Sequence, residues 1–207
     1  TRLSEPKSLK NIRGLVAGLS HSPANPEFSA LPNVVDEVNA VNSIMGNSKR
    51  LLDKSFTDKN LFDDGQGEPI IHLASHGQFS SDPDNTFILG WNGKITLRSI
   101  EKLIRSRIGE PLELLILSAC STAEGDNRAT LGIAGTALQA GARSIVASLW
   151  TVNDESQSQL MQSFYKELKA GKTKAEALRI AQLSLKNTPK FNNPYLYASL
   201  VLVGSWK

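Results

Sequence analysis

Apolar runs alternate with amphipathic stretches along most of this chain. Runs rich in Val, Ile and Leu, bounded by Gly, Pro or polar residues, are typical of buried strands. They predict strands at 13–20, 50–54, 70–75, 112–117, 144–149 and 197–203. Apolar residues at helical spacing predict helices at 34–45, 97–108, 133–140, 154–168 and 173–185. A hairpin turning at Asn92-Gly93 is predicted for 87–96.

Buried strands that alternate with helices indicate an α/β fold, in which helices cover both faces of a mainly parallel sheet. No repeat, low-complexity tract or linker separates the elements, so residues 1–207 are expected to form one domain. The polar segment 78–86 is expected to be a surface loop. Because the chain begins with Thr1 rather than Met, we expect it to be a fragment of a longer multidomain protein.

Composition excludes several classes of protein. Of the 207 residues, 40% are hydrophobic and 21% charged, which is typical of a globular domain. The net charge of +3 is scattered rather than gathered in a basic block, so a nucleic-acid partner is not expected. The apolar runs are too short for a membrane span, and no signal peptide is visible. A single cysteine rules out an internal disulfide and fits a reducing, cytoplasmic location.

Two of the predicted strands lead into reactive side chains. The run 69–77 delivers His76, and the run 114–125 delivers Cys120, the lone cysteine. Because the carboxyl ends of parallel strands meet at one edge of a sheet, both residues are expected there. A histidine base beside a cysteine nucleophile is the arrangement that covalent acyl transfer requires, with the N–H groups of Gly77 and Cys120 as candidate oxyanion donors. An inert buried cysteine and a structural histidine are the open alternative.

Two other patterns are rejected as sites. His72 and His76 have the spacing of a helical zinc pair, but the segment is strand-like and residue 73 is Leu rather than Glu, so no metal is expected. The Gly-rich stretch 125–135 lacks the endings typical of phosphate loops. We interpret Gly132 and Gly135 instead as positions where a helix packs closely.

Four segments, in this order, resemble the CHAT domain, a branch of the caspase-like cysteine peptidases that includes separase-like proteins. They are 71–77, 117–125, 140–154 and 193–206, and the resemblance extends over about residues 13–206. It implies a caspase-like three-layer α/β/α sandwich and a His–Cys dyad at His76 and Cys120. It also implies that Asp154 shapes an S1 pocket for a basic P1 side chain, although Asp154 as a plain helix cap stays open. Asn193 departs from the family, which often has His there.

The sequence therefore predicts a cysteine endopeptidase that cleaves protein substrates after a basic residue without a cofactor. The alternative is a catalytically silent caspase-like scaffold or regulatory module that binds partner proteins through the same edge. The resemblance implies that helical-repeat or pseudo-caspase domains can precede such a domain in the same chain. No membrane partner is expected.

Overall fold

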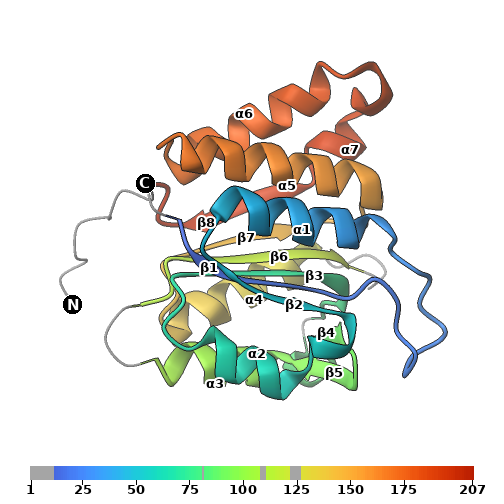
Figure 1. Ribbon diagram of the computed structural model, residues 1–207, viewed down its shortest axis with the longest axis vertical. Coiled ribbons are helices and arrows are strands. Elements are labelled where there is room, and N and C mark those ends of the chain that lie inside the picture. Colours follow the sequence, from blue (N-terminus) through green and yellow to red (C-terminus); the bar gives the residue numbers. More distant parts are fainter. Residues whose placement is uncertain (1–11, 81, 108–110, 122–126) are drawn as a thin grey trace.

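The computed structural model describes residues 12–80, 82–107, 111–121 and 127–207. One eight-stranded sheet runs through the middle of the molecule (Figure 1). Its main strands lie in the order β2-β1-β3-β6-β7-β8, and a β4-β5 hairpin branches from the end of β3. The strands are β1 (Gly14–Gly18), β2 (Lys49–Leu52), β3 (Ile70–Gln78), β4 (Phe87–Gly90), β5 (Gly93–Thr96), β6 (Leu114–Ser121), β7 (Ser144–Ser148) and β8 (Leu200–Gly204).

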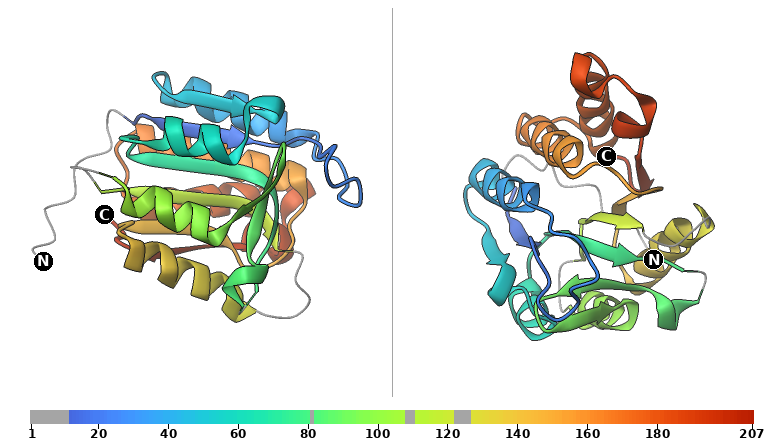
Figure 2. Two further views of the ribbon diagram at one scale, coloured as in Figure 1. Left: turned by 90° about the horizontal axis from the view of Figure 1, so that it is seen from below. Right: turned by 90° about the vertical axis from the view of Figure 1, so that its right-hand side faces the viewer.

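Neighbouring strands from β2 to β7 are parallel, whereas β8 runs antiparallel to β7. Helices cover both faces of this sheet (Figure 2), and one layer lies on the side of α1 and α5 while the other contains α2, α3 and α4. The helices are α1 (Asn33–Met45), α2 (Asp58–Gly65), α3 (Leu97–Arg105), α4 (Asn127–Ala140), α5 (Asp154–Lys169), α6 (Lys174–Lys186) and α7 (Pro194–Tyr197). The predicted three-layer α/β/α architecture with a mainly parallel sheet is confirmed.

Side chains along the six main strands alternate between two apolar cores. In β3, Ile71 and Leu73 belong to the core beneath α2, α3 and α4, whereas Ile70 and Ala74 pack towards α1 and α5. Because both faces are buried, the strands read as continuous apolar runs rather than as alternating patterns. Gly18 allows α1 to lie close to β1, since a Cβ there would approach Val38 Cγ2 to 2.6 Å. This close approach fixes where the first turn of α1 lies.

Several elements differ from their predicted bounds. β3 continues to Gln78, because Gly77 and Gln78 pair with Ile88 and Phe87 of β4. Helix α2 is absent from the prediction, since only Leu61 and Phe62 are apolar in its eight residues; it begins at a Thr57 cap that accepts from Asn60 N. Helix α7 was not predicted either. Helix α4 begins at residue 127 rather than 133.

The interpretation of Gly132 and Gly135 as close-packing positions is wrong. Among the described residues, a Cβ added at either glycine would meet no heavy atom within 4 Å. These glycines therefore do not explain how α4 packs. Within the described ranges, none of the helices is both long and apolar enough to cross a membrane.

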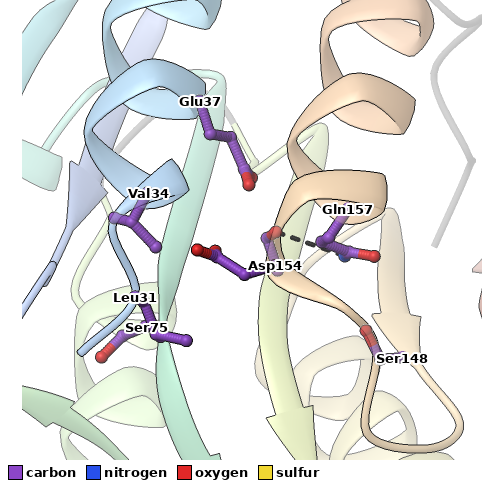
Figure 3. Close-up of a pocket in the computed structure, with 8 residues that line it drawn as sticks. Leu31, Val34, Glu37, Ser75, Ser148, Asp154 and Gln157 are labelled. Atoms are coloured by element: carbon purple, nitrogen blue, oxygen red, sulfur yellow. Dashed lines mark hydrogen bonds between the residues drawn. The ribbon is translucent and has the colours of Figure 1, made fainter. Parts of the chain in front are cut away.

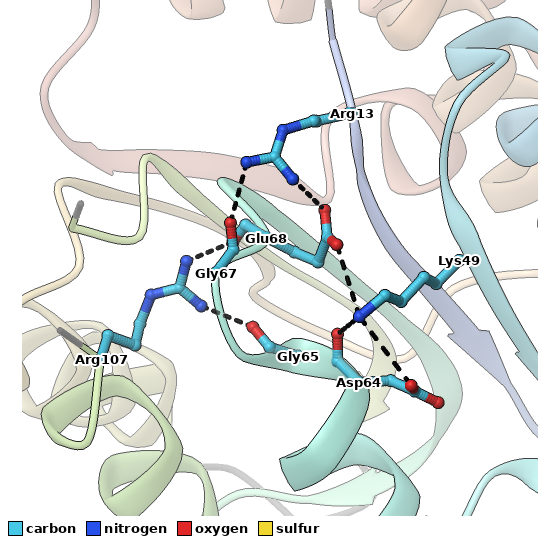
Figure 4. Close-up of polar contacts among 7 residues, drawn as sticks. All are labelled: Arg13, Lys49, Asp64, Gly65, Gly67, Glu68 and Arg107. Carbon is cyan, nitrogen blue, oxygen red and sulfur yellow. Dashed lines mark hydrogen bonds and ion pairs between the residues drawn. The ribbon is translucent and has the colours of Figure 1, made fainter. Parts of the chain in front are cut away.

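A cluster of charged side chains joins elements at the amino edge of the sheet (Figure 4). The Glu68 carboxylate, just before β3, pairs with Arg13 at 3.1 Å and with Lys49 at 3.6 Å. Arg107 donates to two backbone carbonyls, Gly65 O at 2.7 Å and Glu68 O at 2.5 Å. Gly65 ends α2, so the guanidinium occupies a place where cations satisfy free carbonyls.

Candidate active site

The register of the two central strands brings together the positions that the sequence singled out. His76 of β3 lies directly opposite Cys120 of β6 in the parallel ladder. Positions 76 and 120 share the parity of Ile70 and Leu114, which pack on the side of α1 and α5. Opposed positions of neighbouring parallel strands lie on the same face of a sheet. The side chain of Cys120 lies outside the described part of the chain, so contact between thiol and imidazole stays a prediction.

The His76 imidazole is buried and held in one orientation. Its Nε2 lies 2.7 Å from the backbone oxygen of Ser29, in the loop that precedes α1, and its ring lies 5.2 Å from that of Phe28. A carbonyl oxygen can only accept, so the proton of the neutral ring belongs on Nε2. Nδ1 then carries a lone pair, and it has no hydrogen-bond partner among the described residues. An imidazole in this state can accept a proton at Nδ1.

Gly77 lies within the ladder rather than just beyond a strand. It is opposite Ile88 of β4 on one side and Ser121 of β6 on the other. Gly77 and Cys120 therefore lie in the last two residue pairs between β3 and β6. Their use as oxyanion donors stays a prediction.

Asp154 is not the N-cap of its own helix. Asn153 takes that position, with its side chain accepting from Ser156 N at 3.1 Å, and Asp154 is the first residue of α5. The Asp154 carboxylate instead reaches α1, where Asn33 N and Asn33 Nδ2 donate to Oδ2 at 2.8 and 3.0 Å. The cap interpretation is corrected: Asp154 contributes an acceptor to the neighbouring helix.

Asp154 lines a narrow pocket between the first turns of α1 and α5, with a cavity volume of about 10 Å³, room for little more than one water molecule (Figure 3). The other lining residues are Leu31, Val34, Glu37, Ser75, Ser118, Ser148 and Gln157. Burial raises the pKa of the Asp154 carboxyl, and the hydrogen bonds from Asn33 oppose that shift without cancelling it. Nearby Glu37 raises the pKa further, whereas His76 lowers it. The pocket therefore holds a carboxylate that is poorly solvated and faces a second acid.

The second histidine of the strand, His72, belongs to a buried polar chain. Its Nε2 lies 2.8 Å from Glu37 Oε1, and Tyr165 OH lies 3.3 Å from its Nδ1. Burial raises the pKa of the Tyr165 hydroxyl well above its usual value, so this group is a neutral donor. Glu37 and His72 are 1% and 0% exposed, respectively. These three hydrogen-bonded side chains link α5, β3 and α1 beneath the pocket.

Sequence reasoning missed Ser29, Asn33 and Glu37. Ser29 acts through a backbone carbonyl, which any residue supplies, and Asn33 contacts a side chain 121 positions away. Glu37 carried a readable signal, because it falls between Val34 and Val38 on the apolar face of the predicted helix. Asn193, the departure from the family pattern, accepts from Tyr195 N and caps α7.

This architecture is shared with cysteine proteinases of known structure. The Arg-specific cysteine proteinase gingipain R aligns with a TM-score of 0.64 and 10% identity over 96% of this chain and 50% of that chain. A complex of the pro- and mature domains of the Porphyromonas gingivalis enzyme gives 0.60 and 14%, over 96% and 51%. A protein from Geobacter sulfurreducens gives 0.50 and 14%, over 94% and 93%. The chain thus spans about half the length of the gingipain chains.

The fold is therefore caspase-like, related to that of cysteine proteinases. More narrowly, the family model described as the CHAT domain matches residues 1–205, and the chain belongs to that family. None of the curated protein sequences matches it.

Proposed function

We propose that this domain is a cysteine endopeptidase that cleaves protein substrates after a basic residue. Cys120 is the nucleophile, and His76 is first the base and then the acid. The N–H groups of Gly77 and Cys120 are the oxyanion donors. Asp154 binds the P1 side chain. The observation that carries the proposal is the register of His76 against Cys120, together with an imidazole whose Nδ1 is left for proton transfer.

The chemistry follows from the state of the imidazole. Nδ1 takes the thiol proton, and the thiolate attacks the scissile carbonyl to form a tetrahedral intermediate. The Nε2–H, held by Ser29 O, keeps the ring oriented and stabilises the imidazolium that forms. The imidazolium returns the proton to the leaving amine as the C–N bond breaks, giving a thioester on Cys120. Water then hydrolyses this thioester, with His76 again acting as base.

The charge balance of the pocket supports a basic P1 side chain. Asp154 and Glu37 both line it, and no Lys or Arg forms an ion pair with either one in the described part of the chain. Asp154 Oδ1 takes part in neither hydrogen bond from Asn33. The pocket has room for little more than one water molecule, so a guanidinium or ammonium group has to displace its lining to reach Asp154, where it would supply the missing positive charge.

Covalent labelling tests the proposal. The domain is incubated with matched peptidyl fluoromethyl ketones that carry Arg or Leu at P1, and adducts are found by intact mass and peptide mapping. We expect one adduct, on Cys120, formed much faster with the Arg reagent. His76→Ala should abolish this labelling, and Asp154→Asn should remove the preference for Arg.

Reactivity with iodoacetamide serves as the control, because it reports an accessible thiol without requiring the pocket. If Cys120 reacts with iodoacetamide but with neither ketone, the peptidase proposal is wrong and a silent caspase-like module is favoured. Labelling that does not require His76 would also contradict the dyad.

A further inference from the structure

A five-residue segment, 29–33, connects the two proposed functional groups. Its first residue holds His76 through the Ser29 carbonyl at 2.7 Å, and its last residue holds Asp154 through two hydrogen bonds from Asn33. We propose that Asn33 is a positioning residue for both groups, so that binding of a cationic P1 side chain at Asp154 is transmitted through residues 29–33 to the orientation of His76. This inference rests on the proposed function.

The Asn33 end of the segment depends on Asp154. The cap position of α1 is Pro32, which has helical dihedral angles and provides no side-chain acceptor. The first N–H groups of a helix need such acceptors. Asp154 Oδ2 supplies one from α5, and its carboxylate points towards the first turn of α1 (Figure 3). A cation that draws this carboxylate towards itself therefore also pulls on Asn33.

The middle of the segment is held as well. Leu31 N donates to Ser20 O at 2.7 Å, and the Ser20 side chain and N–H donate to the Asp53 carboxylate at 2.8 to 3.1 Å. Asp53 has a φ of 49°, and it is the only non-glycine residue in the described ranges with a positive φ. A non-glycine residue in this region is held there by its surroundings.

The segment is therefore short and anchored. Four residue steps span at most about 14 Å of chain, and residues 29, 31 and 33 are hydrogen-bonded to β3, to the segment after β1 and to α5, respectively. Because the segment is short and held at three points, a displacement of Asn33 also displaces Ser29. Because the Ser29 carbonyl fixes which imidazole nitrogen carries the proton, a small displacement there changes how well Nδ1 serves as a base.

Nuclear magnetic resonance tests this connection without requiring catalysis. The chain has only three histidines, so the ring ¹⁵N signals of His76 can be assigned by substitution. At one fixed pH, the Nδ1 and Nε2 shifts are compared for wild type, Asn33→Ala, Asp154→Ala and the control Asn25→Ala. Asn25 lies in the same loop, and among the described residues its side chain hydrogen-bonds only to Ser22. We expect the His76 shifts to move in the first two variants and not in the control.

A kinetic cycle provides the second readout. For an Arg-P1 peptide, Asn33→Ala should lower kcat/KM by about tenfold with part of the loss in kcat, and by less than about twofold in the Asp154→Asn background. Unchanged His76 shifts in Asn33→Ala, or a loss confined to melting temperature, would make Asn33 a purely structural residue and overturn the proposal. If wild type cleaves no peptide, the proposed function fails, and the ¹⁵N shifts still decide whether residues 29–33 connect the two groups.

Discussion

At the two edges of the central sheet, buried and half-buried carboxylates have opposite kinds of partner. At the amino edge, Glu68 pairs with the cations Arg13 and Lys49. At the carboxyl edge, Asp154 is held by a neutral amide, that of Asn33, and Glu37 by the imidazole of His72. Among the described residues, neither of these two acids forms an ion pair with a Lys or Arg.

This difference separates a structural role from a binding role. A carboxylate whose charge is already balanced, such as Glu68, stabilises the elements that its partners join. A desolvated carboxylate without a cation costs free energy in the empty protein, and a ligand that brings the cation recovers it. Local departures from ordinary pairing are expected at functional sites. Substitutions at the carboxyl edge should therefore change activity, and those at the amino edge should change stability.

The largest expected effect is that of Cys120→Ala. It should abolish peptide cleavage, a loss of several orders of magnitude, and His76→Ala should leave at most a small remainder because the pair acts as a unit. Melting temperature should change little in Cys120→Ala. Steady-state kinetics and thermal unfolding of the three proteins measure both quantities. Wild-type turnover in Cys120→Ala would rule out the mechanism whatever the fold.

The next effect concerns Asp154. Asp154→Asn keeps the size of the side chain and an oxygen that can accept from Asn33, but it removes the charge. It should lower kcat/KM for Arg-P1 peptides by at least about tenfold, or roughly 1.4 kcal/mol, and leave Leu-P1 peptides unchanged. Asp154→Ala should in addition lose about 1 kcal/mol of stability, because α1 loses its acceptor. An unchanged P1 preference in Asp154→Asn would end the S1 assignment.

The amino edge should show the reverse behaviour. Glu68→Gln removes the charge that faces Arg13 and Lys49, whose side chains are nearly half exposed. Solvent screens such pairs, so the expected loss is about 1 kcal/mol in the free energy of unfolding. Denaturant titration measures it, with kcat/KM expected to stay at the wild-type value. A substantial loss of activity without loss of stability would break the contrast between the two edges.

The smallest effect is a pH dependence. Because burial raises the pKa of Asp154, the preference for Arg over Leu at P1 should fall as pH drops through a value above the ordinary carboxyl pKa of about 3.9. Taking the ratio of the two substrates cancels any titration of the dyad. The contribution of Asp154 to stability has the opposite sense: it is present below about pH 3.9 and is lost as pH rises through the raised pKa.

A P1 ratio that is flat with pH in wild type, or an equal slope in Asp154→Asn, would count against ionised Asp154 as the P1 group. By the same argument, Asp154→Asn should be at least as stable as wild type at neutral pH, since the amide does not have to bury a charge.

Much of the sheet could be predicted from the sequence, because its strands are buried on both faces and read as long apolar runs. The edge position of His76 and Cys120 followed from the same rule about parallel strands. Helix α2 could not be found that way, since Leu61 and Phe62 are too few to define a helical period. The role of Asp154 was divided between pocket and cap because its contact with Asn33 depends on how α1 and α5 pack.

The roles of the two glycines of α4 and of His72 could not be decided from the sequence, because each pattern fits two different structures. Glycine is compatible both with close packing and with open space, and the described structure places open space at Gly132 and Gly135. The spacing of His72 and His76 puts both on one face of β3, but His72 is occupied by Glu37 and Tyr165 beneath the pocket. The spacing of two histidines alone does not distinguish a histidine hydrogen-bonded in the core from one of a pair of metal ligands.

A crystal structure of the domain after reaction with an Arg fluoromethyl ketone tests the central claim most directly. We predict a thioether bond to Cys120 Sγ, His76 Nδ1 beside the adduct with Nε2 still held by Ser29 O, and the guanidinium paired with the Asp154 carboxylate in the pocket between α1 and α5. A guanidinium lying elsewhere, or His76 turned away from the modified sulfur, would contradict the account.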